Sequence, residues 1–231
     1  MKLRAAAVAG AAVLGGFVLA PTAGATNECR GLNPCVAVAG PWVVVPVGKG
    51  SPRPQVQYQM TCPRGFVVGG LDAELTDRAI DISFIGASGA PVSPGVSTSR
   101  TVVFVGSYVG GGARAPTFRP HIGCIPAAGG GRRTPTGRSV VYPPAQATTR
   151  RIATVMVTST RHIAVACRAD EDLVGWYVAR AFATPAPPSP ALVASLSVAA
   201  RAAGDQVVAD ARARQGRGIV QVSAVCAGGG R

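Results

Sequence analysis

Six cysteines are the feature that most restricts how this chain can fold: Cys29, Cys35, Cys62, Cys124, Cys167 and Cys226. An even number of cysteines in an exported chain is typical of a disulfide framework. The close Cys-x-x-Cys pairs of structural zinc sites do not occur in the sequence. We therefore expect all six cysteines to form disulfide bonds, and we expect no metal site and no cofactor.

The first 25 residues have the three parts of a secretory signal peptide. Lys2 and Arg4 give a basic start, an apolar run covers residues 5–20, and Ala23-Gly24-Ala25 forms a small-residue cleavage site. The run is short for a bilayer core of about 30 Å, and no later segment reaches about 18 uninterrupted apolar residues. We expect residues 1–25 to be removed and the mature chain to be secreted without a transmembrane segment.

An internal repeat predicts how the cysteines pair. Cys62 and Cys167 each end an alternating, strand-like run, and a second cysteine follows each of them, Cys124 after 62 residues and Cys226 after 59. A Val-Gly step also follows both first cysteines. Two copies of one module of about 100 residues explain this pattern. Among the many pairings that six cysteines allow, the repeat favours Cys62–Cys124 and Cys167–Cys226, with the remaining two closing a short N-terminal loop.

Short β-prone runs recur between Gly- and Pro-rich turns in both copies. In the first copy we expect strands at 42–47, 56–61, 66–75, 80–85, 101–109 and 117–122. In the second we expect them at 151–158, 162–167, 173–182, 192–200, 206–212 and 219–225. Such short, evenly spaced strands favour an antiparallel β-sandwich or barrel-like fold. The sequence thus predicts an all-β protein of two tandem disulfide-closed modules, 26–125 and 150–228, joined by a Gly/Pro/Arg-rich linker at 126–149.

The segment 190–215 has two interpretations. Ser189-Pro190 followed by an Ala-rich run and Gly204 is also typical of a helix, with Ser at the N-cap and Pro in the first turn. Residues 205–215 form a second helix candidate. Leu192, Ala194, Leu196 and Val198 nevertheless alternate as in a strand, and we favour strands here.

Acidic residues gather at Asp72, Glu74, Asp77 and Asp81. The first two lie two apart on an expected strand, so their side chains share one face. Paired carboxylates are able to perform acid–base chemistry or to bind calcium. In so basic a chain, solvated or arginine-paired carboxylates are the more frequent outcome.

His121 and His162 are the only histidines, and each lies in an alternating run close to a cysteine. No Gly-x-Ser-x-Gly motif accompanies them, so we interpret both as structural or surface residues and expect no catalytic residue. Glycine-rich phosphate loops are also missing, which excludes a typical nucleotide site.

Arginines account for most of the formal charge of +13, which arises from 23 Lys+Arg against 10 Asp+Glu. They cluster at Arg132, Arg133 and Arg138, at 150–151, and at 212–217. A field of this sign attracts polyanions, and guanidinium groups match phosphate and carboxylate. An arginine-biased surface without a ligand is the alternative.

The run Cys62-Pro63-Arg64-Gly65-Phe66-Val67-Val68-Gly69-Gly70 resembles the Cys-Pro-x-Gly-x-x-Val-x-Gly-Gly opening of modules in exported bacterial proteins, mostly from high-GC organisms. Those modules also close with a cysteine, as Cys226 does here. In this chain the Gly pair stands one step early, and the second copy lacks the Pro. The resemblance covers 56–226 loosely. It implies secretion and a disulfide-closed β module, and it supplies no catalytic residue because the family is largely uncharacterised.

The sequence therefore predicts a secreted, non-enzymatic binding or structural protein of the cell envelope or extracellular space. Its expected partner is an anionic envelope polymer or another surface protein, contacted through Arg132, Arg133 and Arg138. The alternative is an extracellular hydrolase or calcium-dependent enzyme that uses the cluster of Asp72, Glu74, Asp77 and Asp81.

Overall fold

The computed structural model describes residues 27–32, 34–86, 99–111, 115–127 and 148–228. The expected signal peptide and most of the expected linker, 126–149, lie outside these residues. The first half of the described chain contains β1 (Val36–Ala39), β2 (Trp42–Val44), β3 (Gln55–Thr61), β4 (Phe66–Leu75), β5 (Ile80–Gly86), β6 (Thr101–Tyr108) and β7 (Thr117–Pro126). The second half contains β8 (Thr148–Val157), β9 (Thr160–Ala166), β10 (Glu171–Phe182), α1 (Pro190–Ser195), β11 (Leu196–Ala203), β12 (Gln206–Ala213) and β13 (Gly218–Gly228).

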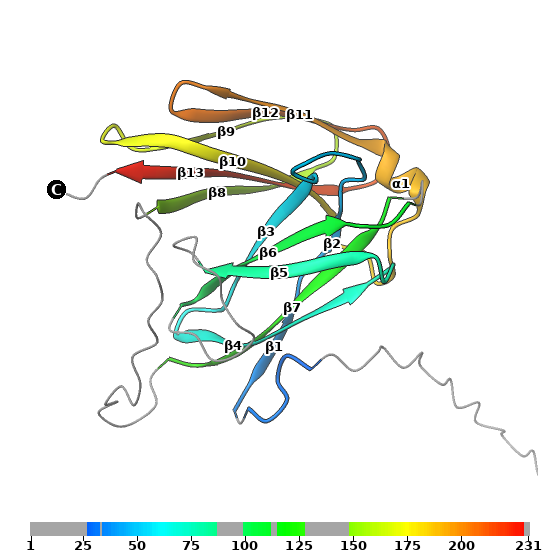
Figure 1. Ribbon diagram of the computed structural model, residues 1–231, viewed down its shortest axis with the longest axis vertical. Helices are drawn as coiled ribbons and strands as arrows, with labels where there is room; N and C mark the ends of the chain where they lie inside the picture. The colour runs from blue at the N-terminus through cyan, green and yellow to red at the C-terminus, as the bar shows by residue number, and fades with distance from the viewer. Residues whose placement is uncertain (1–26, 33, 87–98, 112–114, 128–147, 229–231) are drawn as a thin grey trace, which may run out of the picture.

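All strand pairs in the described chain are antiparallel, which confirms the predicted all-β fold. One sheet has seven strands and curls across the molecule (Figure 1). Two further sheets, β3-β6-β5 and β9-β12-β11, each have three strands. No helix in the described part of the chain is long and apolar enough to cross a membrane.

The two halves use the same order of strand pairing. In the first half β4 pairs with β7, which pairs on its other side with β1 and β2 in succession. In the second half β10 pairs with β13, which pairs on its other side with β8. The three-stranded sheets also correspond, because β3-β6-β5 and β9-β12-β11 have the same order. Each half therefore places two sheets against one core.

A register shift occurs at the same place in each half. The β4–β7 ladder shifts between Val68 and Gly70, and the β10–β13 ladder shifts between Leu173 and Gly175. Val68 lies opposite Cys124, and Leu173 lies opposite Cys226. The glycine that corresponds to Gly175 is therefore Gly70, although the Val-Gly steps in the sequence suggest Gly69.

The three predicted disulfides are present: Cys29–Cys35, Cys62–Cys124 and Cys167–Cys226. The two long-range bonds each join the residue that follows the first strand of a three-stranded sheet to the last strand of the same half. Each thus links the two sheets that enclose one core. The third bond closes the short loop at the start of the described chain.

The seven-stranded sheet is continuous between the halves because β2 pairs with the end of β10, Val43 opposite Ala181 and Trp42 opposite Phe182. We call this β2–β10 pairing the seam. At the seam, each half contributes residues to the hydrophobic core of the other half. Ala179 and Ala181 belong to the first core, and Val44 belongs to the second. The halves therefore share a sheet and part of their apolar interior.

Polar side chains extend the seam to β3, which is an edge strand of its own sheet. Gln221 on β13 is 5% exposed. Both the oxygen and the nitrogen of its side-chain amide form hydrogen bonds with the backbone of Gln59. Its Oε1 accepts from the Gln59 N–H at 2.7 Å, and its Nε2 donates to the Gln59 carbonyl at 3.2 Å. The side chain thereby satisfies main-chain groups that would otherwise remain unpaired on β3.

Arg150 on β8 makes a second polar contact across the seam. Its guanidinium donates to Gln57 Oε1 at 2.6 Å and to Ser223 Oγ at 3.0 Å, and it lies 5.4 Å from the ring centroid of Tyr177. Burial lowers the pKa of Arg150. This arginine therefore connects the two halves and is only partly exposed.

The strand predictions need one correction and one addition. A helix, α1, occupies Pro190–Ser195, and the strand begins only at Leu196. The Ser189 hydroxyl accepts from the Leu192 N–H at 3.2 Å, as an N-cap does, and this local bond outweighs the alternation of apolar residues at 192–198. The strand favoured over a helix at 206–212 is confirmed as β12, and β1 is an addition that was not predicted.

We predict that replacing Gln221 with Leu lowers the free energy of unfolding by about 1–3 kcal/mol, because the Gln59 N–H and carbonyl lose their partner while side-chain volume is kept. Urea denaturation of the purified protein measures this loss. The matched control, Gln215→Leu, changes an exposed side chain in the β12–β13 turn and should leave the unfolding midpoint nearly unchanged. Equal midpoints for the two variants would contradict the role given to Gln221.

Candidate functional site

The four predicted carboxylates of the first half do not form one site. Asp72 and Glu74 lie on β4, as predicted, and share the face that His121 of β7 occupies. Asp77 lies in the turn before β5, where it accepts from the Ala79 N–H and from the Tyr108 hydroxyl, and both bonds lower its pKa. Asp81 is exposed on β5, opposite Ser107 of β6 in a different sheet.

His121 is the centre of a buried polar cluster. Its ring is flanked by two carboxylates, with Nδ1 3.7 Å from Glu28 Oε1 and Nε2 3.1 Å from Glu74 Oε1. The histidine is 6% exposed and Glu28 is 4% exposed. The Nε2 contact lacks hydrogen-bond geometry, and Glu28 Oε2 is also buried without a hydrogen bond among the described residues.

Glu28 was not predicted as part of any site. It lies 93 residues before His121 in the chain, and no motif connects the two. The Cys29–Cys35 bond next to it gives the only sequence signal that this segment has a fixed structure. Asp72 holds the same segment, because its Oδ2 accepts from the Asn27 N–H at 2.6 Å.

Two glycines form the place where this N-terminal segment lies. Gly70 and Gly123 are directly opposite one another on β4 and β7. A Cβ atom at either position would collide with the backbone carbonyl of Glu28. The absence of side chains at this pair therefore allows the disulfide loop to pack against the sheet and brings Glu28 to His121.

In the second half, Glu171 and Arg151 form a bidentate ion pair with N–O distances of 2.8–2.9 Å. Glu171 also accepts from the Arg168 N–H at 2.9 Å. This backbone bond, followed by the bonds from Arg151, lowers the pKa of Glu171. Glu171 is the buried member of this pair and is 6% exposed.

Glu171 lies close to Cys167 and Cys226, and the potential ligand atoms of these three residues all lie within 4.8 Å of one another. Both sulfurs belong to a disulfide bond, so neither is a thiolate that would coordinate a cation. The arrangement stabilises the turn after Cys167 and is not a metal centre.

His162 lies on the exposed face of the β9-β12-β11 sheet. Its Nδ1 is 2.8 Å from Asp210 Oδ1, and the two side chains are 63% and 56% exposed. The residues face each other in the β9–β12 register. His162 is thus a surface residue, as the sequence predicted, and its contact is a cross-strand pair.

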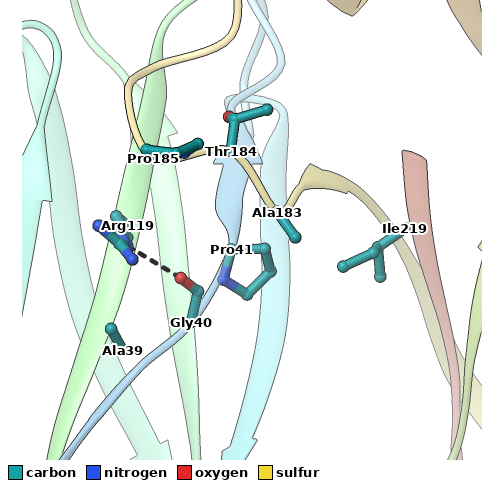
Figure 2. Close-up of a pocket in the computed structure, with 8 residues that line it drawn as sticks. All are labelled: Ala39, Gly40, Pro41, Arg119, Ala183, Thr184, Pro185 and Ile219. Carbon is teal, nitrogen blue, oxygen red and sulfur yellow. Dashed lines mark hydrogen bonds between the residues drawn. The ribbon is translucent and has the colours of Figure 1, made fainter. Parts of the chain in front are cut away.

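An open pocket of about 540 Å³ lies beside the seam. It is lined by Ala39, Gly40, Pro41, Arg119, Ala183, Thr184, Pro185 and Ile219 (Figure 2). Arg119 supplies the only charge in this lining. Its Nε donates to the Gly40 carbonyl at 3.1 Å, as the dashed line shows, and its guanidinium lies 6.0 Å from the centroid of a Trp42 ring.

Four exposed arginines gather at one end of the second half, and we call them the arginine patch: Arg161, Arg212, Arg214 and Arg217. Arg161 is the second residue of β9 and lies opposite Ala211 of β12, whereas Arg212 lies opposite Thr160. The two arginines are therefore diagonal neighbours at this end of the sheet, with side chains on opposite faces. The Ala213 N–H donates to the Ser159 carbonyl, which holds the β12–β13 turn beside the β8–β9 turn. The sequence pointed to 212–217, but Arg161 joins them only through the strand register.

None of these arginines has a carboxylate partner among the described residues, in which Arg151 is the only Arg or Lys with such an ion pair. The nearest acid along β12 is Asp210, which contacts His162. The patch is therefore a cationic surface whose guanidinium groups face solvent. The predicted contact residues Arg132, Arg133 and Arg138 lie outside the described residues.

No protein-family model matches the chain, and neither a curated protein nor a solved structure matches it.

We predict that Gly123→Ala detaches the N-terminal loop, because the added methyl group would occupy the position of the Glu28 carbonyl. The Cys29–Cys35 bond should then be reduced by dithiothreitol at least several-fold faster, as measured by alkylation and mass spectrometry. Gly111→Ala is the control, since a Cβ there meets no atom within 4 Å. Equal reduction rates in both variants would show that the glycine pair does not hold the loop.

Proposed function

We propose that this protein is a secreted, non-enzymatic binding protein that contacts anionic polymers of the cell envelope or extracellular space. The observation that carries the proposal is the arginine patch. Four exposed guanidinium groups lie on adjoining turns and strand ends of the second half, and no described carboxylate neutralises them. Clustered cations without acidic partners create a local potential that attracts a polyanion.

Secretion is part of this proposal and is supported by two independent features. The chain has a basic, apolar and small-residue sequence at 1–25. All six cysteines form disulfide bonds, which are typical of proteins that fold in an oxidising compartment.

The proposal also includes that the protein consists of two copies of one module. We further propose that these copies belong to the group of exported bacterial modules that the Cys62–Gly70 run resembles. Three structural correspondences support the duplication. The strand order is the same in both halves, both ladders shift register beside the second cysteine, and both first cysteines precede a turn. In those turns Phe66 N–H donates to the Pro63 carbonyl, and Glu171 N–H donates to the Arg168 carbonyl.

An extracellular hydrolase or calcium-dependent enzyme is the less well supported proposal. Asp72 is engaged by Asn27, Glu74 contacts His121, and Asp77 is engaged by Ala79 and Tyr108. Each of these carboxylates holds a strand, a turn or the N-terminal loop. Asp81 is exposed on β5, which belongs to a different sheet, so the four do not converge on a substrate-sized space.

We predict that the variant Arg212→Ser, Arg214→Ser, Arg217→Ser elutes from a heparin column at a clearly lower salt concentration than the unchanged protein. The matched control Arg30→Ser, Arg64→Ser, Arg78→Ser removes the same charge from exposed positions in the first half. It should elute close to the unchanged protein, because screening limits the reach of charges to about 10 Å at 0.1 M salt.

Equal shifts in the two variants would mean that net charge, and not the patch, determines retention. A protein that is not retained at low salt would contradict the proposal as a whole. A third variant of the same charge, with Arg132, Arg133 and Arg138 changed to Ser, tests the contact that the sequence alone predicted. If only this variant loses retention, the contact surface lies in 126–149 and the patch is not the site.

A further inference from the structure

The seam between the halves joins two different strand edges. One is the outer edge of β2, the strand at which the first half's part of the sheet ends. The other is the outer edge of β10, the strand at which the second half's part begins. In order, the sheet runs β4-β7, then β1 and β2, then β10-β13-β8. Because the halves correspond strand for strand, β4 has the role of β10, and β8 has the role of β2.

This correspondence leaves two strand edges at the ends of the sheet. Among the described strands, β4 pairs only with β7 and β8 pairs only with β13. These are the same two kinds of edge that meet inside the molecule at the seam. An unpaired edge strand is a template for pairing with another chain. The free edge of β8 should therefore fit the free edge of β4 in a second copy.

The register of the internal seam predicts the register of this contact. We align the two halves at their register shifts, so that Gly70 corresponds to Gly175. In this alignment Thr76 corresponds to Ala181, and Leu75 corresponds to Arg180. On the other edge, Val44 faces Thr117 of β7 and Met156 faces Ile219 of β13. Since Val43 pairs with Ala181, the equivalent pair between copies is Val155 with Thr76. Met156 would then lie opposite Leu75.

The exposure of these two residues is an independent observation. Leu75 is 43% exposed and Met156 is 48% exposed, and both are among the seven large apolar side chains that the described chain leaves in solvent. Nothing in the register argument uses their exposure. The alignment nevertheless makes them direct cross-strand neighbours, where apolar side chains stabilise a strand pair.

We propose that copies of this protein associate head to tail, with β8 of one copy pairing with β4 of the next and so extending the seven-stranded sheet. The contact is heterologous, because the two surfaces differ. It therefore generates an open filament, or a ring if the rotation between copies closes. The Asp77–Ala79 turn ends β4, so the pairing is short, as the internal β2–β10 pairing is, and assembly should depend on protein concentration.

Sedimentation equilibrium on the full mature protein tests this proposal. We expect the average mass of the unchanged protein to rise with concentration beyond that of a dimer. Leu75→Lys and Met156→Lys each place a charge on one edge, and each variant alone should remain monomeric. The control Val47→Lys changes an exposed apolar residue away from both edges and should assemble like the unchanged protein.

An equimolar mixture of the two edge variants gives the most specific result. Each retains the edge that the other has lost, so the mixture should form dimers and nothing larger. Circular dichroism and thermal unfolding confirm that both variants are folded. A monomeric unchanged protein at millimolar concentration would overturn the proposal. So would a loss of assembly in Met156→Lys alone, which indicates a symmetric β8–β8 contact, or a mixture that remains monomeric.

Discussion

The pairing of β2 with β10 is the interaction on which the rest of the architecture depends. It converts two separate sheets into one, and it sends Ala179 and Ala181 into the first core and Val44 into the second. The same pairing brings β13 and β8 beside β3, where Gln221 and Arg150 bond the Gln59 backbone and the Gln57 side chain. Within this arrangement, removing either side chain would leave its partner buried without a hydrogen bond, which costs about 1–3 kcal/mol.

Several buried titratable residues of the described chain contact other structural elements. Glu28, Glu74 and His121 lie between the disulfide loop and the sheet, and Glu171 with Arg151 holds the turn after Cys167. The arginine patch differs from these clusters because its charges are exposed and unopposed by described carboxylates. This contrast is the physical reason why binding is proposed at the patch rather than at the carboxylates.

The sequence predicted local features well because they depend on neighbouring residues. Alternation marked most strands to within a few residues, and the spacing of Cys62, Cys124, Cys167 and Cys226 predicted their bonds. The prediction was wrong at Pro190–Ser195, where a single side-chain cap decides the conformation. Alternation continues through this turn, so periodicity alone was not able to detect the helix.

Features that depend on distant residues were not predictable. Nothing near Glu28 in the sequence indicates that it meets His121, because their contact requires the Gly70–Gly123 pair to lie directly opposite in register. The β2–β10 pairing has only two residue pairs and no sequence signal of its own. Arg161 joined the arginine patch for the same reason, since only the β9–β12 register places it opposite Ala211, the residue before Arg212.

Native-state hydrogen exchange at the seam tests the central claim most directly. If the halves share one sheet, amides of β2 and of the end of β10 should exchange as slowly as those of the central strand β13, through the same cooperative unfolding event. Mass spectrometry of peptides that cover 42–45, 179–183 and 219–226 provides the comparison. Rapid exchange at 42–45 and 179–183, with β13 still protected, would contradict the account and show that the halves fold as independent units.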